Sequence, residues 1–249
     1  MQRTRVIRKL LDVIFPVACV TCDREGMWLC RRCFAAAPLD GRRRCPVCFA
    51  AGARHPTCPH PLSQLIVAGP YADSSIAPAI QGLKFSYLTA LAKPLGLLLA
   101  RSLAPHLHRA AFSPILVPIP LHPRRERARG FNQSRSIARC AGVVLDLPVA
   151  DTLLTRQRQT LQQSTLDRDA RRRNLAGAFA VPGGISRTDR TFILIDDVCT
   201  SGATLTAAAR VLEHAGARSI WGATIASDAP LYRNASDWYS TRATRASSH

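Results

Sequence analysis

Hydrophobic positions along the chain fall into two patterns, short continuous apolar runs and longer segments with helical spacing. The apolar runs at residues 65–71, 115–120, 192–195 and 219–226 predict buried strands. Helical spacing at about residues 76–85, 90–103, 132–145 and 205–214 predicts the helices between them. Residues 192–226 therefore form a strand, loop, helix, strand unit, which is typical of a parallel sheet with helices on both faces.

Three segments fall outside this pattern. Residues 6–15 place their apolar positions largely on one helical face and end at Pro16, which predicts an amphipathic helix. Residues 124–130 predict an arginine-rich loop, and residues 151–173 a polar, mobile excursion from the core. We therefore expect an N-terminal helix and cysteine-rich module over residues 1–62, an α/β domain over residues 63–228, and a polar, poorly ordered tail over residues 229–249.

The composition is that of a packed protein with an unusual positive charge. Of the 249 residues, 47% are hydrophobic and 20% are charged, which argues against global disorder. The net charge is +18, and only three of the 34 basic residues are lysines. Such a charge favours polyanionic partners, either nucleic acid or phosphorylated metabolites. A base-composition bias of the genome is the alternative source of the arginines.

The sequence predicts no membrane span, because no segment reaches the roughly 18 apolar residues that a span requires. The apolar run after the basic N-terminus faintly resembles a secretory signal, but Asp12 and Pro16 interrupt it and no cleavage pattern follows. We therefore expect a cytoplasmic protein.

The segment after the third predicted strand has the composition of a phosphate-binding loop. Asp196 and Asp197 stand at the strand tip, followed by Thr200, Ser201, Gly202, Ala203 and Thr204. Backbone N–H groups and the helix dipole favour an anion at this position, and the hydroxyls can donate to phosphate oxygens. The alternative is a soluble turn in which the Thr and Ser residues cap the next helix.

This segment resembles the signature with which type I phosphoribosyltransferases bind phosphoribosyl pyrophosphate (PRPP). Ser201 stands where that family usually has Thr, which keeps the hydroxyl. The resemblance implies that Asp196 and Asp197 contact the ribose 2′ and 3′ hydroxyls as the catalytic acids, and that residues 200–204 hold the 5′-phosphate. It also implies a Mg²⁺ ion carried on the pyrophosphate. A regulator that binds PRPP without turnover would show the same signature.

The likeness extends over nearly the whole chain. Residues 117–125, the Arg-Gly-Phe-Asn-Gln stretch at 129–133, Leu-Lys-Phe at 83–85, residues 162–179 and the N-terminal cysteines together resemble the competence protein ComF family. That family is a branch of the phosphoribosyltransferase-like proteins. Guanidinium groups suit a pyrophosphate because they donate two hydrogen bonds at once. The candidate PRPP ligands are therefore Arg124, Arg125, Arg127 and Arg129, with Lys84 as a further one. For each alone, a solvated surface charge is the alternative.

Seven of the nine cysteines lie within the first sixty residues, and six of these form C-x-x-C pairs, which favours metal binding over disulfides. The candidate ligands are Cys19, Cys22, Cys30, Cys33, Cys45, Cys48, Cys58 and His60, enough for two structural zinc sites. Joining the first pair with the third, and the second with Cys58 and His60, leaves comparable gaps; joining neighbours forces a very short first loop. The spacing leaves the pairing open. The module usually ends in another cysteine pair in related proteins, and a redox or disulfide role is the alternative.

The resemblance implies two functions. One is transfer of a phosphoribosyl group from PRPP to an unidentified acceptor. The other is non-catalytic handling of single-stranded DNA during DNA uptake and natural transformation, with the uptake machinery as partner. For the second function, the candidate nucleic-acid contacts are Arg31, Arg32, Arg42, Arg43 and Arg44, beside the cysteines. A metabolite-sensing regulator also fits the loop.

Overall fold

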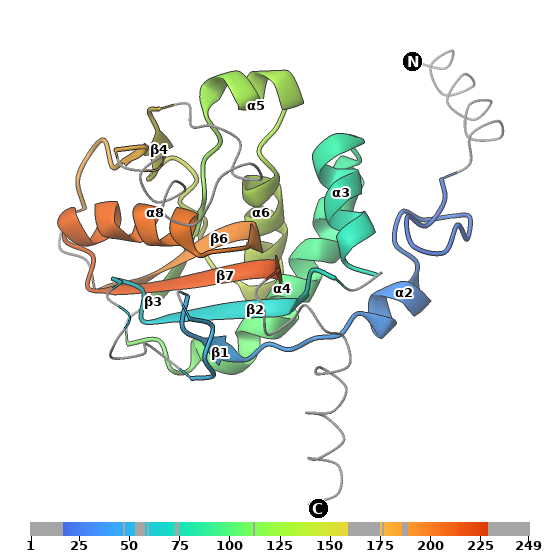
Figure 1. The fold of residues 1–249 in the computed structure, drawn as a ribbon, viewed down its shortest axis with the longest axis horizontal. Coiled ribbons are helices and arrows are strands. Elements are labelled where there is room, and N and C mark those ends of the chain that lie inside the picture. Colours follow the sequence, from blue (N-terminus) through green and yellow to red (C-terminus); the bar gives the residue numbers. More distant parts are fainter. Residues whose placement is uncertain are drawn as a thin grey trace, which may run out of the picture.

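The structure, a computed structural model, is built around one mostly parallel sheet (Figure 1). It describes residues 17–46, 48–52, 58, 60–72, 75–111, 113–158, 175, 177–185 and 189–228. The sheet has the strand order β1-β2-β7-β6-β3, where β1 is Arg43–Arg44, β2 Gln64–Pro70, β3 Ser113–Pro118, β6 Arg190–Cys199 and β7 Ser219–Ser227. Strands β2, β7, β6 and β3 are parallel, and β1 pairs antiparallel with β2 at the edge.

The parallel strands are apolar because both of their faces are covered. Every residue of β2 and of β7 is buried. The register places Ile195 of β6 opposite Pro118 of β3 and Ala223 of β7. The carboxyl ends of the parallel strands therefore meet at one edge of the sheet.

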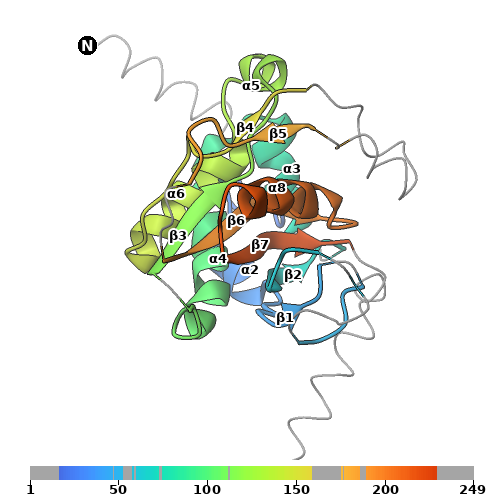
Figure 2. The same cartoon turned by 90° about the vertical axis from the view of Figure 1, so that its left-hand side faces the viewer.

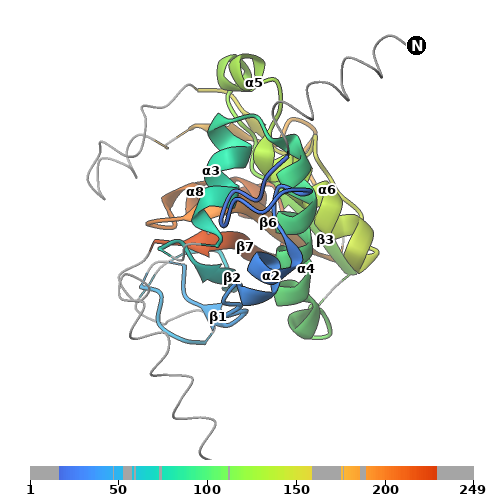
Figure 3. The same ribbon diagram turned by 90° about the vertical axis from the view of Figure 1, so that its right-hand side faces the viewer.

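Helices cover the two faces of this sheet (Figures 2 and 3). One face carries α2 (Arg31–Ala36), α3 (Ala77–Phe85), the 3-10 turn η1 (Thr89–Leu91), α4 (Ala92–Leu107) and α6 (Gln133–Leu145), and the other carries α8 (Ala203–His214). Leu99 of α4 and Ile137 of α6 share a core with Ile193 of β6, whereas Leu205 of α8 shares a second core with Leu194. Neighbouring residues of β6 thus serve opposite faces, as strand geometry requires.

The connections that follow β3 and β6 leave the sheet toward opposite faces. After β3, the chain forms α5 (Pro123–Arg129) and α6 and reaches a parallel bridge between Leu116 and Val149. It then passes through the hairpin of β4 (Thr155–Arg156) and β5 (Phe179–Ala180), on the α8 side, before β6 leads into α8 (Figure 2). Ligands of doubly wound sheets bind where such connections diverge. In this fold that crevice lies between β3 and β6.

These elements confirm the predicted α/β fold with a parallel sheet covered on both faces. The predicted loop at residues 124–130 is wrong, because the segment forms helix α5. The ring of His122 caps this helix by accepting the backbone N–H of Arg124, and Pro123 suits the first turn. Gly130, with φ 80, ends it in the left-handed region.

Strand β6 is longer than predicted. Pairing with β7 continues from Asp196 to Cys199, so both acids lie on the strand rather than in the loop after it. The predicted helix at residues 6–15, the tail at 229–249 and most of the polar excursion, residues 159–174, lie outside the described residues.

Candidate functional site

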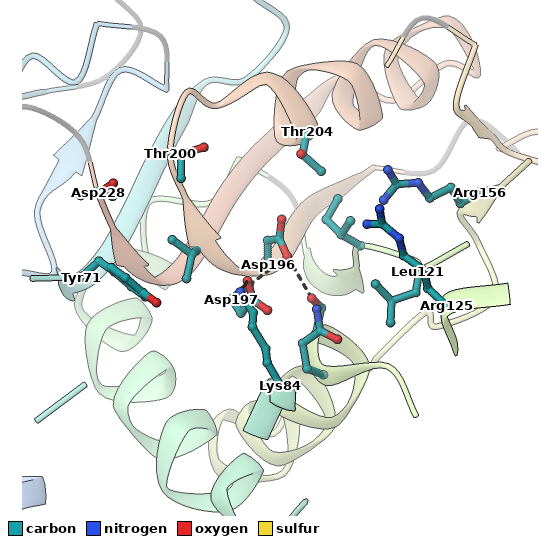
Figure 4. A pocket seen from close by; sticks show the side chains of 14 residues that line it. Tyr71, Lys84, Leu121, Arg125, Arg156, Asp196, Asp197, Thr200, Thr204 and Asp228 are labelled. Carbon is teal, nitrogen blue, oxygen red and sulfur yellow. Dashed lines mark hydrogen bonds and ion pairs between the residues drawn. The ribbon is translucent and has the colours of Figure 1, made fainter. Parts of the chain in front are cut away.

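A cavity of about 390 Å³ opens at the carboxyl edge of the sheet, in the crevice between β3 and β6 (Figure 4). It is lined by Tyr71, Lys84, Ile119, Leu121, Arg125, Gln133, Ser134, Arg156, Asp196, Asp197, Val198, Thr200, Thr204 and Asp228. The two acids of β6 lie at its centre, with Lys84 below them and Arg125 and Arg156 to one side (Figure 4). The cavity therefore offers both carboxylates and cations to a ligand.

The loop between β6 and α8 consists of Thr200, Ser201 and Gly202. Gly202 precedes α8 with φ 70, a left-handed conformation that favours glycine. A Cβ atom there would lie 2.0 Å from the carbonyl oxygen of Pro46, so this close approach also requires glycine. The first N–H groups of α8 have no partner within the helix and suit an anion. Ser201 Oγ is buried without a hydrogen-bond partner among the described residues, so it too can serve a ligand.

The two acids have different partners. Asp196 Oδ1 accepts hydrogen bonds from Ser134 Oγ at 3.0 Å and from the backbone N–H of Asp197 at 2.9 Å. Asp197 Oδ1 pairs with Lys84 Nζ at 2.8 Å. Asp197 Oδ2 is buried and has no hydrogen-bond partner in the described part of the chain. A buried carboxylate oxygen without a donor costs stability, and a ligand hydroxyl would satisfy it.

The electrostatics of the pair follow from this crowding. Burial raises the pKa of Asp196 to about 7, and the Asp197 carboxylate adds to the rise, which Lys84 and the hydrogen bonds from Asp197 and Ser134 only partly offset. Burial alone would lower the pKa of Lys84, but attraction to Asp197 outweighs it and the pKa is raised. Asp196 is therefore partly protonated near neutral pH, and hydroxyl donors would favour its charged form.

Arg125 of α5 and Arg156 of β4 supply the basic side of the cavity. The Arg156 guanidinium lies over the ring of Phe179, 5.4 Å from its centroid. Burial lowers the pKa of Arg156, and the nearby charge of Arg125 lowers it further. Because two guanidinium groups repel each other here, an anion that binds both would relieve that repulsion.

The structure brings together most of the predicted phosphate ligands. Lys84, Arg125, Asp196, Asp197, Thr200 and Thr204 line the cavity, and Ser201, Gly202 and Ala203 line an adjoining recess of about 20 Å³ formed by the loop. Of the other predicted arginines of α5, Arg124 and Arg127 are exposed, and neither they nor Arg129 line the cavity.

Five polar residues that line the cavity were not predicted from the sequence: Tyr71, Gln133, Ser134, Arg156 and Asp228. Tyr71 directly follows β2 and Asp228 directly follows β7, so the rule that ligands bind at the carboxyl edge would have found both. Gln133 and Ser134 looked like an ordinary helix start. No local signal marks Arg156, which reaches the cavity through the pairing of β4 with β5.

The five arginines predicted to contact nucleic acid differ in exposure. Arg31 and Arg32 are exposed on α2, whereas Arg42 and Arg43 are half-buried at β1. Arg44 is buried, pairs with Asp40 at 2.7 Å and donates to the Phe49 carbonyl at 3.2 Å. Arg44 therefore stabilises the module itself.

Neighbouring cysteine pairs form two clusters. The sulfur atoms of Cys19, Cys22, Cys30 and Cys33 (the first cluster) lie within 4.8 Å of one another, as do those of Cys45, Cys48 and Cys58 (the second cluster). His60 Nε2 lies 3.4 Å from Cys45 Sγ, which brings a fourth side chain to the second cluster. The interleaved pairing is therefore wrong. A bridge between Ala18 and Glu25 folds the first loop tightly enough for neighbours to meet.

Both clusters can hold a metal ion. Tetrahedral zinc with Zn–S bonds of about 2.3 Å places its sulfur ligands roughly 3.8 Å apart. The sulfur atoms of Cys22 and Cys30 lie 3.7 Å apart, and all nine cysteines are free of disulfides. Each cluster has one exposed ligand, Cys22 in the first and Cys48 in the second.

Comparison with known proteins gives the family. Residues 128–244 match the model of the phosphoribosyl transferase domain. The DNA utilization protein YhgH of Escherichia coli is 32% identical over 206 residues, which span 78% of this chain and 88% of that protein. This chain belongs to the ComF family of phosphoribosyltransferase-domain proteins.

Two further ComF-family relatives are competence proteins by name. Competence protein F of Haemophilus influenzae is 28% identical over 166 residues, 64% of this chain and 71% of that protein. Competence protein ComFC of Bacillus subtilis is 38% identical over 104 residues, 41% of this chain and 39% of that protein. The resemblance seen in the sequence motifs is thereby confirmed. None of the helices in the described residues has the length and apolar character needed to cross a membrane.

Proposed function

We propose that this ComF-family protein binds PRPP or a related phosphoribosyl ligand in the cavity. Residues 200–204 hold the 5′-phosphate, and Asp196 and Asp197 accept hydrogen bonds from the ribose hydroxyls. The observation that carries the proposal is the buried, unpartnered Asp197 Oδ2 on the strand that leads directly into an anion-binding loop. A lone phosphate would be repelled by the acids, and a neutral sugar would leave the loop unused. A sugar phosphate binds both the loop, through its phosphate, and the two carboxylates, through its hydroxyls.

The pyrophosphate of PRPP faces the basic side in this proposal. Arg125 and Arg156 donate hydrogen bonds to it in pairs, which relieves the repulsion between their guanidinium groups. Lys84 holds Asp197 in place through its ion pair. A Mg²⁺ ion, bound mainly through the ligand's own phosphate oxygens, would supply further charge compensation.

Phosphoribosyl transfer is the catalytic form of this proposal. The bond between ribose C1 and the pyrophosphate oxygen breaks, the acceptor's nucleophile forms the new bond to C1, and pyrophosphate leaves with both electrons of the broken bond. Positive charge develops on the ribose, where the carboxylates of Asp196 and Asp197 stabilise it. Arg125 and Arg156 stabilise the negative charge that develops on the leaving group.

We further propose that zinc is the metal of both cysteine clusters, because thiolates and imidazole are its preferred ligands. Its role is structural, since a small module with little core of its own depends on metal to fold. Metal analysis of the purified protein is expected to give two zinc ions per chain, and a metal-free folded protein would contradict this.

A second candidate function is the handling of single-stranded DNA during uptake in the cytoplasm, together with the uptake machinery. It is supported by the net charge of +18 and by relatives named for DNA utilization and competence. It predicts single-strand binding that weakens steeply as salt rises, because phosphate contacts release counterions. Purified protein that ignores single-stranded DNA at low salt would exclude this function.

Isothermal titration calorimetry with PRPP and Mg²⁺ tests the first function. Wild type is expected to bind, and Asp196→Asn/Asp197→Asn to lose about tenfold or more in affinity, since a charge-assisted hydrogen bond contributes roughly 1.5–3 kcal/mol. Asp146→Asn is the matched control, because Asp146 is exposed at the end of α6 with φ 54, a conformation that Asn also tolerates. Equal affinities of wild type and the double variant would refute the assignment.

A further inference from the structure

Two aromatic side chains stand exposed at and just beyond the end of α3, the helix that carries the cavity residue Lys84. Phe85, the neighbour of the cavity residue Lys84, is 67% exposed, and Tyr87 is 57% exposed. The other large hydrophobic side chains exposed within the described ranges are not aromatic: Met27, Leu97, Val143 and Val144. Large exposed aromatic groups beside a polar pocket are typical of a contact surface rather than of core packing.

The backbone holds Tyr87 in this place at a conformational cost. Its φ is 56, in the left-handed region that bulky residues rarely adopt. The N–H groups of Ser86 and Leu88 both donate to the Gly82 carbonyl at 3.2 Å, which ends α3. Leu91 is then fully buried, so the chain returns to the core and leaves Tyr87 in solvent. Backbone strain of this kind gathers at functional sites.

A cation adjoins one of the exposed rings. The Arg129 guanidinium lies 5.9 Å from the centroid of the Phe85 ring, and it donates to the cavity residue Gln133 at 2.5 Å. Helix α5, which carries Arg129, has no buried residue and also bears Arg124, Arg125 and Arg127. The Phe85 ring, the Arg129 guanidinium and the cavity residue Gln133 therefore lie side by side.

We propose that Phe85, Tyr87 and Arg129 bind an unpaired nucleobase of single-stranded nucleic acid at the mouth of the cavity. Every base has a π-face that stacks on an aromatic ring, while the strand's phosphates bind the arginines of α5. Stacked base pairs cover these faces in a duplex, so the surface selects single strands. The inference rests on the second candidate function, names the side chains that perform it, and does not require PRPP.

Fluorescence anisotropy with a labelled oligothymidylate at low salt tests this surface. Phe85→Ala/Tyr87→Ala is expected to weaken binding about tenfold or more, because each stacked base contributes roughly fivefold or more to affinity. Phe85→Trp keeps an aromatic face and is expected to bind like wild type, whereas Phe85→Leu keeps only apolar bulk and should bind like Phe85→Ala. Val143→Ala, which trims an 85% exposed aliphatic side chain on α6, is the matched control.

An oligonucleotide with abasic sites separates stacking from phosphate contacts. Wild type and the double variant are expected to bind it equally weakly. Oligothymidylate binding by the double variant at wild-type strength overturns the inference. So does full affinity in Phe85→Leu, because the surface then serves a non-aromatic contact such as a docked protein. If wild type itself ignores oligothymidylate, the second candidate function fails and the inference falls with it; if wild type binds and the double variant binds equally well, only the stacking surface fails. PRPP calorimetry on the wild type is a separate readout of the phosphoribosyl pocket.

Discussion

The two walls of the cavity are built in different ways. The loop wall, residues 196–204, continues a central strand that pairs with a neighbour on each side, and its Gly202 packs against Pro46. The basic wall, Arg125 and Arg156, comes from a helix without buried residues and from a strand of two residues. The loop wall is therefore preformed, whereas the basic wall is held by few packed contacts. Defects in the loop wall should cost more affinity than equal defects in the basic wall.

The loop wall also depends on the second cysteine cluster. Pro46, within the C-x-x-C pair of that cluster, contacts Gly202, and the nearby Phe49 shares a core with Leu205 of α8. The first cluster instead shares a core with Leu95 of α4, on the other face of the sheet. The two cysteine clusters thus support opposite faces of the sheet, and the second one packs against the loop wall.

Gly202→Ala should produce the largest loss. An alanine at φ 70 is strained, and its Cβ would meet the Pro46 carbonyl oxygen at 2.0 Å, so the loop must move. We expect PRPP affinity to fall about 100-fold, since the left-handed strain of roughly 1–2 kcal/mol alone corresponds to about 5–30-fold and the collision with Pro46 adds to it. Isothermal titration calorimetry of Gly202→Ala with PRPP and Mg²⁺ measures this loss of affinity.

Gly184→Ala is the control for Gly202→Ala. Gly184 has φ 64 but no atom within 4 Å of its added Cβ, so it carries the strain without the collision. If both variants bind PRPP equally well, the packing of Pro46 against the loop does not contribute to PRPP affinity. That result would contradict the greater sensitivity expected of the loop wall.

Loss of the metal from the second cysteine cluster should weaken PRPP binding more than loss from the first. Cys48→Ser and Cys22→Ser each remove the exposed ligand of one cluster. We expect Cys48→Ser to weaken PRPP binding about fivefold more than Cys22→Ser, because only the second cluster contacts the loop, and a preformed site loses affinity when its support loosens. Zinc analysis verifies that each variant has lost one ion. The reverse order of affinities would contradict the assigned roles.

On the basic wall, Arg125→Ala should have a smaller effect than Gly202→Ala, about tenfold in PRPP affinity, as expected for one charge-assisted contact. Arg124→Ala is the matched control, since Arg124 is exposed on the same helix and does not line the cavity. Equal losses in the two variants would show that α5 acts through its overall charge rather than through Arg125.

The smallest effect concerns pH. Burial and the charge of Asp197 raise the pKa of Asp196 from 3.8 to about 7. The folded state therefore retains a proton that the unfolded state releases, so stability falls as pH rises between those two values. Asp196→Asn abolishes this loss of stability. The gain is well under the roughly 4 kcal/mol that the full pKa shift would give, because Asp196 remains partly exposed.

Melting temperatures across this range measure the effect. The gain of Asp196→Asn over wild type is expected to be small near pH 4 and to grow until about pH 8. A difference that stays constant with pH would show that Asp196 is not the titrating group.

The sequence predicts what local patterns determine. Continuous apolar runs located β2, β3, β6 and β7, and the motif at residues 196–204 located the loop wall. Local composition and spacing are enough to predict these elements. The end of β6 was misplaced because pairing of Asp196 with Thr224, and of Cys199 with Ser227, extends the strand past its apolar run. A tertiary partner, not the local pattern, decides that boundary.

The remaining features depend on contacts between distant segments. Arg156 reaches the cavity only through the antiparallel pairing of β4 with β5, and Gly202 meets Pro46 across about 150 residues of chain. No local spacing in the sequence predicts either contact. Helix α5 was missed although His122, Pro123 and Gly130 form proper start and stop signals, because the density of charge favoured a loop.

Phosphorus-31 NMR of PRPP reports directly on where each phosphate binds, because the 5′-phosphate and the pyrophosphate give separate resonances. With wild-type protein and Mg²⁺, the 5′-phosphate resonance should shift or broaden on binding to the loop wall, and Gly202→Ala should abolish that change while Gly184→Ala preserves it. A 5′-phosphate resonance that wild type leaves unchanged, or that Gly202→Ala perturbs as wild type does, would contradict the placement of PRPP on this loop.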